Sequence, residues 1–189
     1  KRRGLQLKSG DTVTQFPAQP ERPFRQALLP IESIIVDPRL QLRADGLDQD
    51  YVADLSAAYD SGALVPHIVV FQYGDENSVY WLADGFHRHA AATAIGWREL
   101  LVEIRQGDRK AAFRYALQAN GQHGKRRTLD DAVYAYRRAI AESLVEPGDA
   151  PAVAALLGIS DRWAREITRE ARDRANAERD ATIQRLAQE

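Results

Sequence analysis

The sequence of 189 residues predicts an α+β fold, in which a small mixed sheet with helices is followed by an all-helical module that contains a helix-turn-helix. Three observations support this prediction. Short β-rich runs alternate with helical stretches as far as Asn120. Strand signals then stop, and the chain from Thr128 onward has helical character. Near Gly158, small and apolar residues have the spacing of two helices joined by a tight turn.

The composition is ordinary for a water-soluble globular chain, with 44% hydrophobic and 28% charged residues. No apolar run reaches the roughly 18 residues that suggest a membrane span, so we expect no membrane partner. Cysteine is absent, which excludes disulfides, thiolate metal sites and cysteine nucleophiles, and makes a cytoplasmic location the default. We divide the chain into a flexible basic arm (1–25), an α/β domain (26–124) and a helical domain (125–189).

The elements of the α/β domain follow from short local signals. An apolar run closed by Asp37-Pro38 predicts the first strand, and apolar residues four apart predict the first helix. Two β-rich runs around the turn at Gly74–Ser78 predict a hairpin, and an Ala-rich stretch before Gly96 predicts a helix. The expected ranges are a strand at Leu28–Val36, a helix at Asp48–Asp60, strands at Ile68–Tyr73 and Val79–Ala83, a helix at Gly85–Ile95, a strand at Leu100–Arg105, and a helix from Asp108 towards Asn120.

The helical domain opens with Thr128-x-x-Asp131, which resembles a capping box with Asp in place of the usual Glu or Gln, and we expect a helix from there to about Leu144. Pro147-Gly148 breaks it. Helices at Pro151–Leu157 and from Ser160 to at least Arg174 complete the helix-turn-helix, with Ser160 as the cap of the second helix.

The most informative segment is Asp84–Ala94. An apolar strand ends at Asp84, and Gly85 permits an unusual backbone angle and the close approach of a ligand. The helix that follows at once has unpaired N–H groups suited to an anion, and Arg88 can add a charged contact to phosphate. The segment is therefore a candidate phosphate site. A glycine-led turn with a surface arginine explains the pattern as well.

His87 and His89 are two residues apart and point to different sides of the expected helix. They are candidate acid/base groups with Asp84, or ligands of a divalent metal. Glu103 and Asp108 are weaker candidates. Hydrogen-bonding histidines near a helix start and capping or solvated carboxylates are the alternative interpretations, and the sequence identifies no metal ligands.

The order Asp84, then Gly85-x-x-Arg88-x-x-Ala91, resembles the phosphate motif of the ParB/sulfiredoxin superfamily. The form with Phe86 resembles plasmid- and phage-type ParB-like proteins, which include plasmid fertility-inhibition factors. Further stretches resemble the family in the same order along residues 28–170. They are Leu29–Ile34, Gln41-Leu42-Arg43, Gly62–Val70, Ala119-Asn120-Gly121-Gln122-His123 and Arg127–Asp130.

The resemblance implies a ParB/sulfiredoxin-like domain that binds ATP or CTP, with Mg²⁺ or another divalent cation, and that acts at DNA. Some members hydrolyse the nucleotide, some cleave DNA, and one branch phosphorylates free serine. The residues that it implies for nucleotide or phosphate binding are Arg43, Gly85, Phe86, Arg88, Ala91, Asn120, Gln122 and His123. The resemblance also leaves room for a homodimer.

Two departures from the family bear on activity. The family's Glu before Asn120 is Ala119 here, and its Arg after Gln122 is His123. That Glu helps to hold metal and phosphates in clamp-type members. Sulfiredoxin activity needs a cysteine in the Gly85–Arg88 loop, and this chain has none.

Two parts of the chain are candidates for contact with DNA. Residues 105–127 carry seven Lys or Arg and one Asp, so Arg126 and Arg127 are candidates for phosphate contacts, and a solvated helix face explains this charge equally well. In the second helix of the helix-turn-helix, we expect the DNA-facing residues to be Ser160, Arg162, Arg165 and Arg169. A helical hairpin that packs on the first domain is the alternative.

Three functions remain open at this point. The first is an NTPase, with nucleotide-regulated cleavage of DNA as a further activity, in which Asp84, His87, Arg88 and His89 are the catalytic residues. The second is a non-catalytic partition or regulatory protein that binds DNA and uses nucleotide as a switch. The third is a small-molecule kinase, which would leave the basic stretch without a role.

Overall fold

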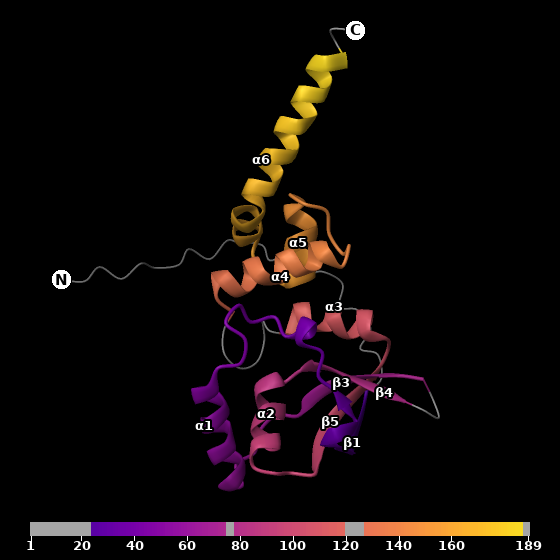
Figure 1. Cartoon of the computed structure of the whole chain (residues 1–189), viewed down its shortest axis with the longest axis vertical. Helices are drawn as coiled ribbons and strands as arrows, with labels where there is room; N and C mark the ends of the chain where they lie inside the picture. Colours follow the sequence, from indigo (N-terminus) through magenta and orange to yellow (C-terminus); the bar gives the residue numbers. More distant parts are fainter. Residues whose placement is uncertain (1–23, 75–77, 120–126, 187–189) are drawn as a thin grey trace, which may run out of the picture.

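The computed structural model describes residues 24–74, 78–119 and 127–186 of the chain. In this part, a five-stranded mixed sheet has helices on both faces, and further helices stack above it (Figure 1). The strands are β1 (Arg25–Pro30), β2 (Ile34–Ile35), β3 (Ile68–Tyr73), β4 (Val79–Asp84) and β5 (Glu99–Gln106). The helices are α1 (Gln49–Asp60), α2 (Phe86–Ala94), α3 (Arg109–Ala119), α4 (Leu129–Ala141), α5 (Ala150–Leu157) and α6 (Asp161–Leu186), with 3-10 turns η1 (Ile31–Ser33) and η2 (Pro38–Leu40).

The caps that the sequence indicates are confirmed. Asp108 accepts a hydrogen bond from the Ala111 N–H at 2.8 Å, which starts α3. Thr128 and Asp131 form the reciprocal capping box at the start of α4. The end of α4 lies at Ala141 rather than near Leu144, because Ser143 adopts a left-handed backbone (φ 52°) that stops the helix.

The expected strand at Leu28–Val36 is wrong as a single element. It is split into β1 and β2 by η1, and the two strands have different partners. β1 pairs antiparallel with β5, with Leu28 opposite Leu101, whereas β2 pairs parallel with β4. The pairing of β1 with β5 ends at Pro30, and the Ile31 N–H donates to the Arg98 carbonyl oxygen at 2.9 Å where η1 begins.

The sheet is strongly curled. Its strand order is β1-β5-β3-β4-β2, so β1 and β2 form opposite edges although only the three residues of η1 join them. Four strand spacings of about 4.8 Å would separate the edges of a flat sheet by about 19 Å. Even a fully extended link of this length reaches only about 14 Å. The two edges must therefore bend towards each other.

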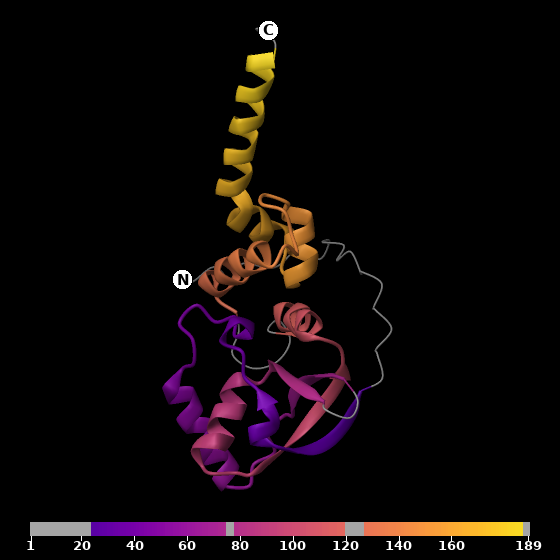
Figure 2. The ribbon, with the colours of Figure 1, turned by 45° about the vertical axis from the view of Figure 1, so that its right-hand side comes forward.

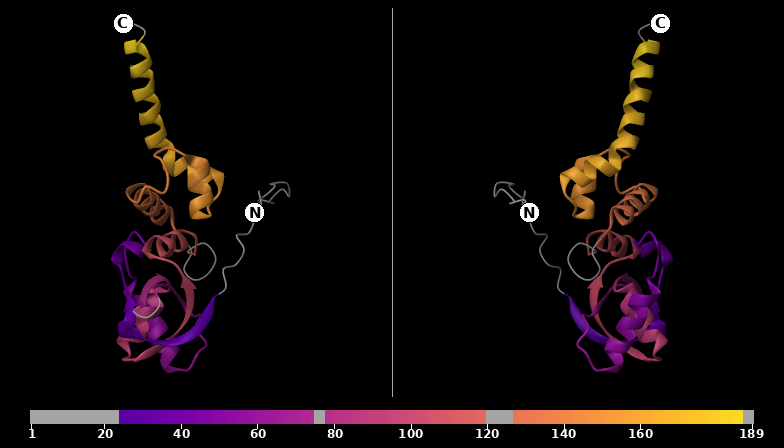
Figure 3. Two further views of the ribbon diagram at one scale, coloured as in Figure 1. Left: turned by 90° about the vertical axis from the view of Figure 1, so that its right-hand side faces the viewer. Right: turned by 90° about the vertical axis from the view of Figure 1, so that its left-hand side faces the viewer.

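Two hydrophobic cores lie on the two sides of the sheet. One joins Ile68, Val70 and Leu82 to Ala92 of α2. The other joins Val69 and Phe71 to Phe113 and Leu117 of α3, and it continues into α4, α5 and α6. Helix α3 therefore lies between the sheet and the upper helices (Figures 1 and 3). Phe86 at the start of α2 packs against both cores.

Helix α6 begins in the helical layer, and its C-terminal part extends away from the rest of the molecule in every view (Figures 1, 2 and 3). Its first turns are anchored by Ala164 and Thr168, which are fully buried. Among the described residues, no helix combines the length and the apolar character needed to cross a bilayer.

Candidate functional site

The junction between β4 and α2 is built around Gly85. Its φ of 94° lies in the left-handed region, where side chains are disfavoured. A Cβ atom placed there would lie 2.5 Å from Cγ2 of Ile68, the first residue of β3. Glycine thus lets the end of β4 approach β3 closely and then turn directly into α2. The helix begins with no side-chain cap from Gly85, so its first turn is a polarised N-terminus of the kind that attracts anions.

Arg88 is held tightly in that first turn. Its Nη1 donates to the carbonyl oxygens of Pro66, at 2.8 Å, and His67, and its Nη2 donates to Oδ2 of Asp84 at 2.9 Å. The side chain is only 15% exposed. Arg88 therefore fastens the loop before β3 to the start of α2 and places a fixed positive charge at the helix N-terminus.

The two histidines have separate surroundings. His87 accepts a hydrogen bond through Nε2 from the Asp48 N–H at 3.1 Å, and its ring meets Tyr51 edge-on at 5.3 Å. It thereby contacts the start of α1. Burial lowers the pKa of His89, and a hydrogen bond with the Ile31 backbone opposes that shift only in part. Its Nε2 atom is buried without a hydrogen-bond partner.

The proposed catalytic residues therefore contact three different elements: Asp84 pairs with Arg88, His87 with the start of α1, and His89 with η1. Among the described residues, no group of three or more histidines and carboxylates is arranged to hold a metal ion. Of the weaker candidates, Glu103 pairs with Arg105 at 2.6 Å and Asp108 caps α3. Both carboxylates thus have structural partners.

Arg43, predicted from the family resemblance to bind phosphate, contacts the helical module. Its Nη1 lies 2.8 Å from Oδ2 of Asp131 in α4. Asn120, Gln122, His123 and Arg126 lie outside the described residues. Ala91 is fully buried in α2. Of the predicted nucleotide residues, the structure therefore groups Gly85, Phe86 and Arg88 at one turn and places Arg43 beside α4.

Arg127 differs from the expectation of a DNA-facing side chain. It is half-buried, and its two terminal nitrogens donate to the carbonyl oxygens of Leu117, at 2.8 Å, and Leu157, at 3.0 Å. Burial and repulsion from Arg43 lower the pKa of Arg127 to about 10, although Asp131 opposes this. The side chain thus joins the C-terminal turns of α3 and α5, where the carbonyl ends of helices favour a cation.

The helix-turn-helix geometry is present in α5 and α6. Gly158 takes a left-handed backbone (φ 62°), and Ser160 accepts a hydrogen bond from the Trp163 N–H at 3.3 Å. Arg162, Arg165 and Arg169 are exposed, as is Trp163. A loose ion pair of 3.9 Å joins Arg169 to Glu166. The exposed face of α6 therefore combines three cations with acidic residues.

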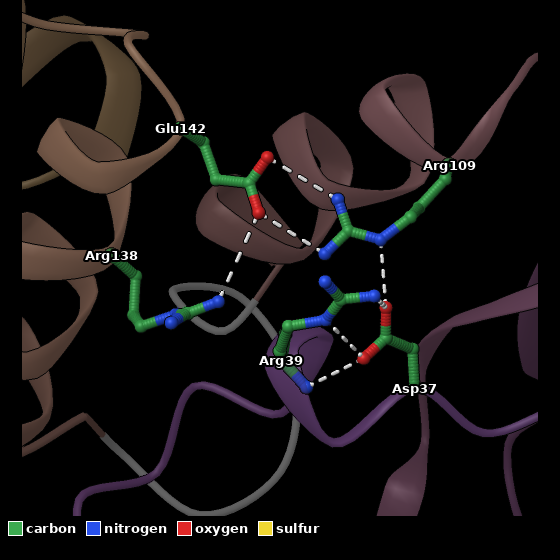
Figure 4. A network of polar contacts seen from close by, with 5 residues as sticks. All are labelled: Asp37, Arg39, Arg109, Arg138 and Glu142. Carbon is green, nitrogen blue, oxygen red and sulfur yellow. Dashed lines mark hydrogen bonds and ion pairs between the residues drawn. The ribbon is translucent and has the colours of Figure 1, made fainter.

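A polar network that sequence reasoning missed connects the sheet to the helices (Figure 4). Asp37, before η2, accepts hydrogen bonds from Arg39 at 2.9–3.0 Å and from Arg109 of α3 at 2.7 Å. Arg109 also binds Glu142, just past α4, at 3.1 Å, and Arg138 lies 3.9 Å from the same carboxylate. Burial opposes the charge on Asp37, yet the arginine hydrogen bonds outweigh it and hold the pKa far below its ordinary value.

The chain matches the family model of the ParB N-terminal domain over residues 19–121. A curated relative, named as a possible regulatory protein of the streptomycin biosynthesis operon of Streptomyces griseus, is 32% identical over 113 residues, or 60% of this chain. The matched region is 29% of that relative, so the chain spans less than a third of its length.

Solved structures share the fold at low identity. The pNOB8-like ParB N-domain has a TM-score of 0.58 at 13% identity, with 81% of this chain and 66% of that one covered. ParB from Caulobacter crescentus, C-terminally truncated and complexed to the centromeric parS site, has a TM-score of 0.52 at 21% identity, with 77% and 70% covered. The family model matches more than half of the residues, and this chain belongs to the ParB N-terminal domain family.

Proposed function

We propose that the chain binds a nucleoside triphosphate at the start of α2 and associates with DNA through α6. The proposal that the chain binds a nucleotide rests on the turn at Gly85. The backbone there leaves no room for a side chain, and Arg88 is fixed in the first helical turn beside it. A polarised helix N-terminus with a positioned guanidinium is an arrangement suited to phosphate oxygens. Family membership supports the same ligand, because ParB-like proteins bind CTP or ATP.

The geometry favours a nucleotide-binding regulatory protein over an enzyme. His87 contacts the start of α1 and His89 contacts η1. The two histidines therefore do not form one set of acid/base groups with Asp84, and the proposal of nucleotide binding does not depend on them. Mg²⁺ commonly binds through nucleotide phosphates and one or two carboxylates. Asp84, which is 22% exposed beside the Gly85 turn, is the described carboxylate that fits this role. Hydrolysis of ATP or CTP, cleavage of DNA, and transfer of phosphate to a small acceptor remain the alternatives.

The nucleotide proposal is tested by replacing Arg88. We expect Arg88→Ala to weaken the binding of ATP or CTP with Mg²⁺ by at least about tenfold, because a charge-assisted contact to phosphate is lost. Calorimetric titration of all four nucleoside triphosphates measures this. Arg98→Ala removes an exposed arginine just after α2 and should bind as the wild type does. Equal affinity in Arg88→Ala and the wild type, with both folded, would contradict the site.

Phosphate release and plasmid nicking in the same samples separate binding from catalysis. Turnover that depends on Arg88 would favour the NTPase, and nicked plasmid would add the nuclease. Release of phosphate only when free serine or a similar acceptor is present would favour the kinase.

The proposal that the chain binds DNA rests on the exposed arginines of α6. We expect Arg162→Ala and Arg165→Ala each to weaken DNA binding and to flatten its dependence on salt, because each removes a cation that can neutralise a backbone phosphate. Arg137→Ala makes the same charge change on an exposed position of α4 and is the matched control. Electrophoretic mobility shifts at several salt concentrations give the measurement. A loss of affinity that is equal in all three variants would show that net charge, and not α6, governs binding.

A further inference from the structure

Strand β1 forms one edge of the sheet and lies on its outer side (Figures 2 and 3). It pairs with β5 on one side, and in the part of the chain that the structure describes no strand pairs with its other side. The side chains of β1 alternate between the core and solvent, and Leu29 is the buried one. Leu28 is 60% exposed, and Leu101, its neighbour across β5, is 41% exposed. The edge therefore carries an apolar pair that nothing described covers.

The backbone at the free edge is oriented for pairing with another strand. In an antiparallel ladder, successive residues direct their N–H and C=O groups alternately towards one neighbour and towards the other side. The Ile31 N–H donates to the Arg98 carbonyl oxygen at 2.9 Å, which continues the register of β1 and β5. Alternate residues counted back from Ile31 therefore bond to β5. The residues between them direct their N–H and C=O groups away from β5, and these are Phe24, Gln26 and Leu28.

The middle of this edge lacks the features with which sheets commonly prevent edge pairing, such as outward charges, prolines and bulges. The register of β1 with β5 runs without a bulge from Arg25 to Pro30. Pro30 stands only at the end of the strand. The charge of Arg25 lies over the sheet, because its Nη2 donates to Oε1 of Gln72 in β3 at 3.1 Å. The stretch from Phe24 to Leu28 is therefore open to a further strand.

We propose that β1 pairs antiparallel with β1 of a second copy of this chain, about a two-fold axis at Gln26. In this register, Gln26 lies opposite Gln26 of the second copy, and Phe24 lies opposite Leu28 of the second copy. Every outward N–H and C=O group from Phe24 to Leu28 then has a partner. A two-fold axis perpendicular to the sheet keeps the exposed side chains of both copies on one face. Each Leu28 thus lies between Leu101 of its own chain and Phe24 of the other, and such apolar cross-strand pairs stabilise a sheet.

A second copy fits this edge because the edge is complementary to itself. The same residues serve both chains, so the contact closes as a dimer and leaves no further edge of this kind exposed. A register shifted by two residues would set Phe24 against Pro30 and Leu28 against Gln26. The carbonyl oxygen of Pro30 already accepts a hydrogen bond from the Ser33 hydroxyl at 2.7 Å. The register centred on Gln26 therefore pairs both the backbone and the apolar side chains better.

The contact is small, and its strength follows from that. One short strand from each chain buries far less surface than a permanent interface does. We therefore expect a dimer whose population rises with protein concentration. The interface does not include the Gly85 turn or α6, so the dimer is independent of the proposed binding of nucleotide and DNA.

The register is tested with a single introduced cysteine, because the chain has none of its own. Across an antiparallel pair, the two Cα atoms at position 26 lie about 5.5 Å apart, which a disulfide can bridge. Gln118→Cys makes the same change at an exposed position of α3 and is the matched control. Under mild oxidation, we expect Gln26→Cys to form the linked dimer at least about tenfold faster than Gln118→Cys. Equal rates, or no linked dimer from Gln26→Cys, would overturn the proposal.

The interface is tested without cysteines by sedimentation equilibrium of the full chain, in the absence of nucleotide and DNA. Leu28→Lys places a charge against Phe24 of the second copy and should raise the dissociation constant of the dimer at least about tenfold. Leu64→Lys is the control, because Leu64 is 102% exposed and lies outside β1, and it should dimerise as the wild type does. A wild type that stays monomeric at every concentration would reject the second copy as the occupant of this edge. A dimer of unchanged affinity in Leu28→Lys would place the interface elsewhere. Either result would leave the proposed function untouched.

Discussion

Replacing Asp37 with alanine is expected to lower the free energy of unfolding by about 3 kcal/mol, as is typical when one partner of a buried ion pair is removed. The carboxylate is 6% exposed and binds Arg109 at 2.7 Å. Arg39 is 62% exposed and can be solvated after the change, whereas Arg109 is 21% exposed and keeps only Glu142. Urea denaturation at neutral pH gives the value. Asp45→Ala, which removes an exposed carboxylate, should change stability little.

Acid should reduce this difference. The pKa of Asp37 is lower in the folded chain than in the unfolded chain, so the unfolded chain binds the proton first as the pH falls. The stabilisation by Asp37 is therefore complete above about pH 5 and declines as the pH falls through about 4 towards the folded value. Hydrogen bonds from Arg109 also lower the pKa of Glu142, which acts in the same direction. A gap between wild type and Asp37→Ala that is as large at pH 3 as at pH 7 would exclude an ionic origin.

The second large effect is expected at Gly85. Gly85→Ala should destabilise the fold by about 3 kcal/mol, which combines the strain of a left-handed alanine with overpacking. The new Cβ would lie 2.5 Å from Cγ2 of Ile68 and 3.2 Å from Cζ of Arg88. Thermal and urea unfolding measure the loss. Gly96→Ala is the control, because Gly96 also has a left-handed backbone (φ 76°) but no atom within 4 Å of an added Cβ, so about 1 kcal/mol is expected there.

A double-mutant cycle with Ile68→Ala identifies the cause of the Gly85 effect. Ile68→Ala removes the atom closest to the new Cβ, so Gly85→Ala should cost at least about 1 kcal/mol less in that background. Strict additivity of the two changes would show that backbone strain alone is responsible. Nucleotide affinity of Gly85→Ala, measured where the variant is still folded, would then report on the turn itself.

Local signals in the sequence were enough for most of the fold. The hairpin of β3 and β4, the glycine turn before α2 and the caps at Asp108 and Thr128 depend on residues within a few positions of each other. Their outcome is therefore readable from spacing and residue type. The prediction of a single strand at Leu28–Val36 was wrong because apolar residues lie on both sides of η1, and the break at Glu32 and Ser33 within it is short. Only the partners of β1 and β2, far away in sequence, separate the two strands.

Only those residues of the candidate site that are close together in the sequence could be predicted from it. Gly85 and Arg88 lie in one turn and were identified together. The contacts of Arg43 with Asp131 and of Asp37 with Arg109 join residues that are far apart in the chain, and no local pattern marks them. The one feature of the sequence that bears on these contacts is Asp131, which stands in the capping box of α4 where Glu or Gln is usual. In the structure, this aspartate both caps α4 and accepts a hydrogen bond from Arg43.

The curled sheet has a consequence for the order of folding. Both edge strands lie near the start of the described chain, but β1 needs β5 and β2 needs β4 as partners. Pairings over long stretches of chain carry a high loop-closure entropy and form slowly. During synthesis, β3, β4 and α2 emerge before β5 exists, so β1 must wait unpaired until the chain has passed Gln106. Among the described strands, the first to leave the ribosome is thus among the last to be paired, and its apolar residues are exposed to other chains until then.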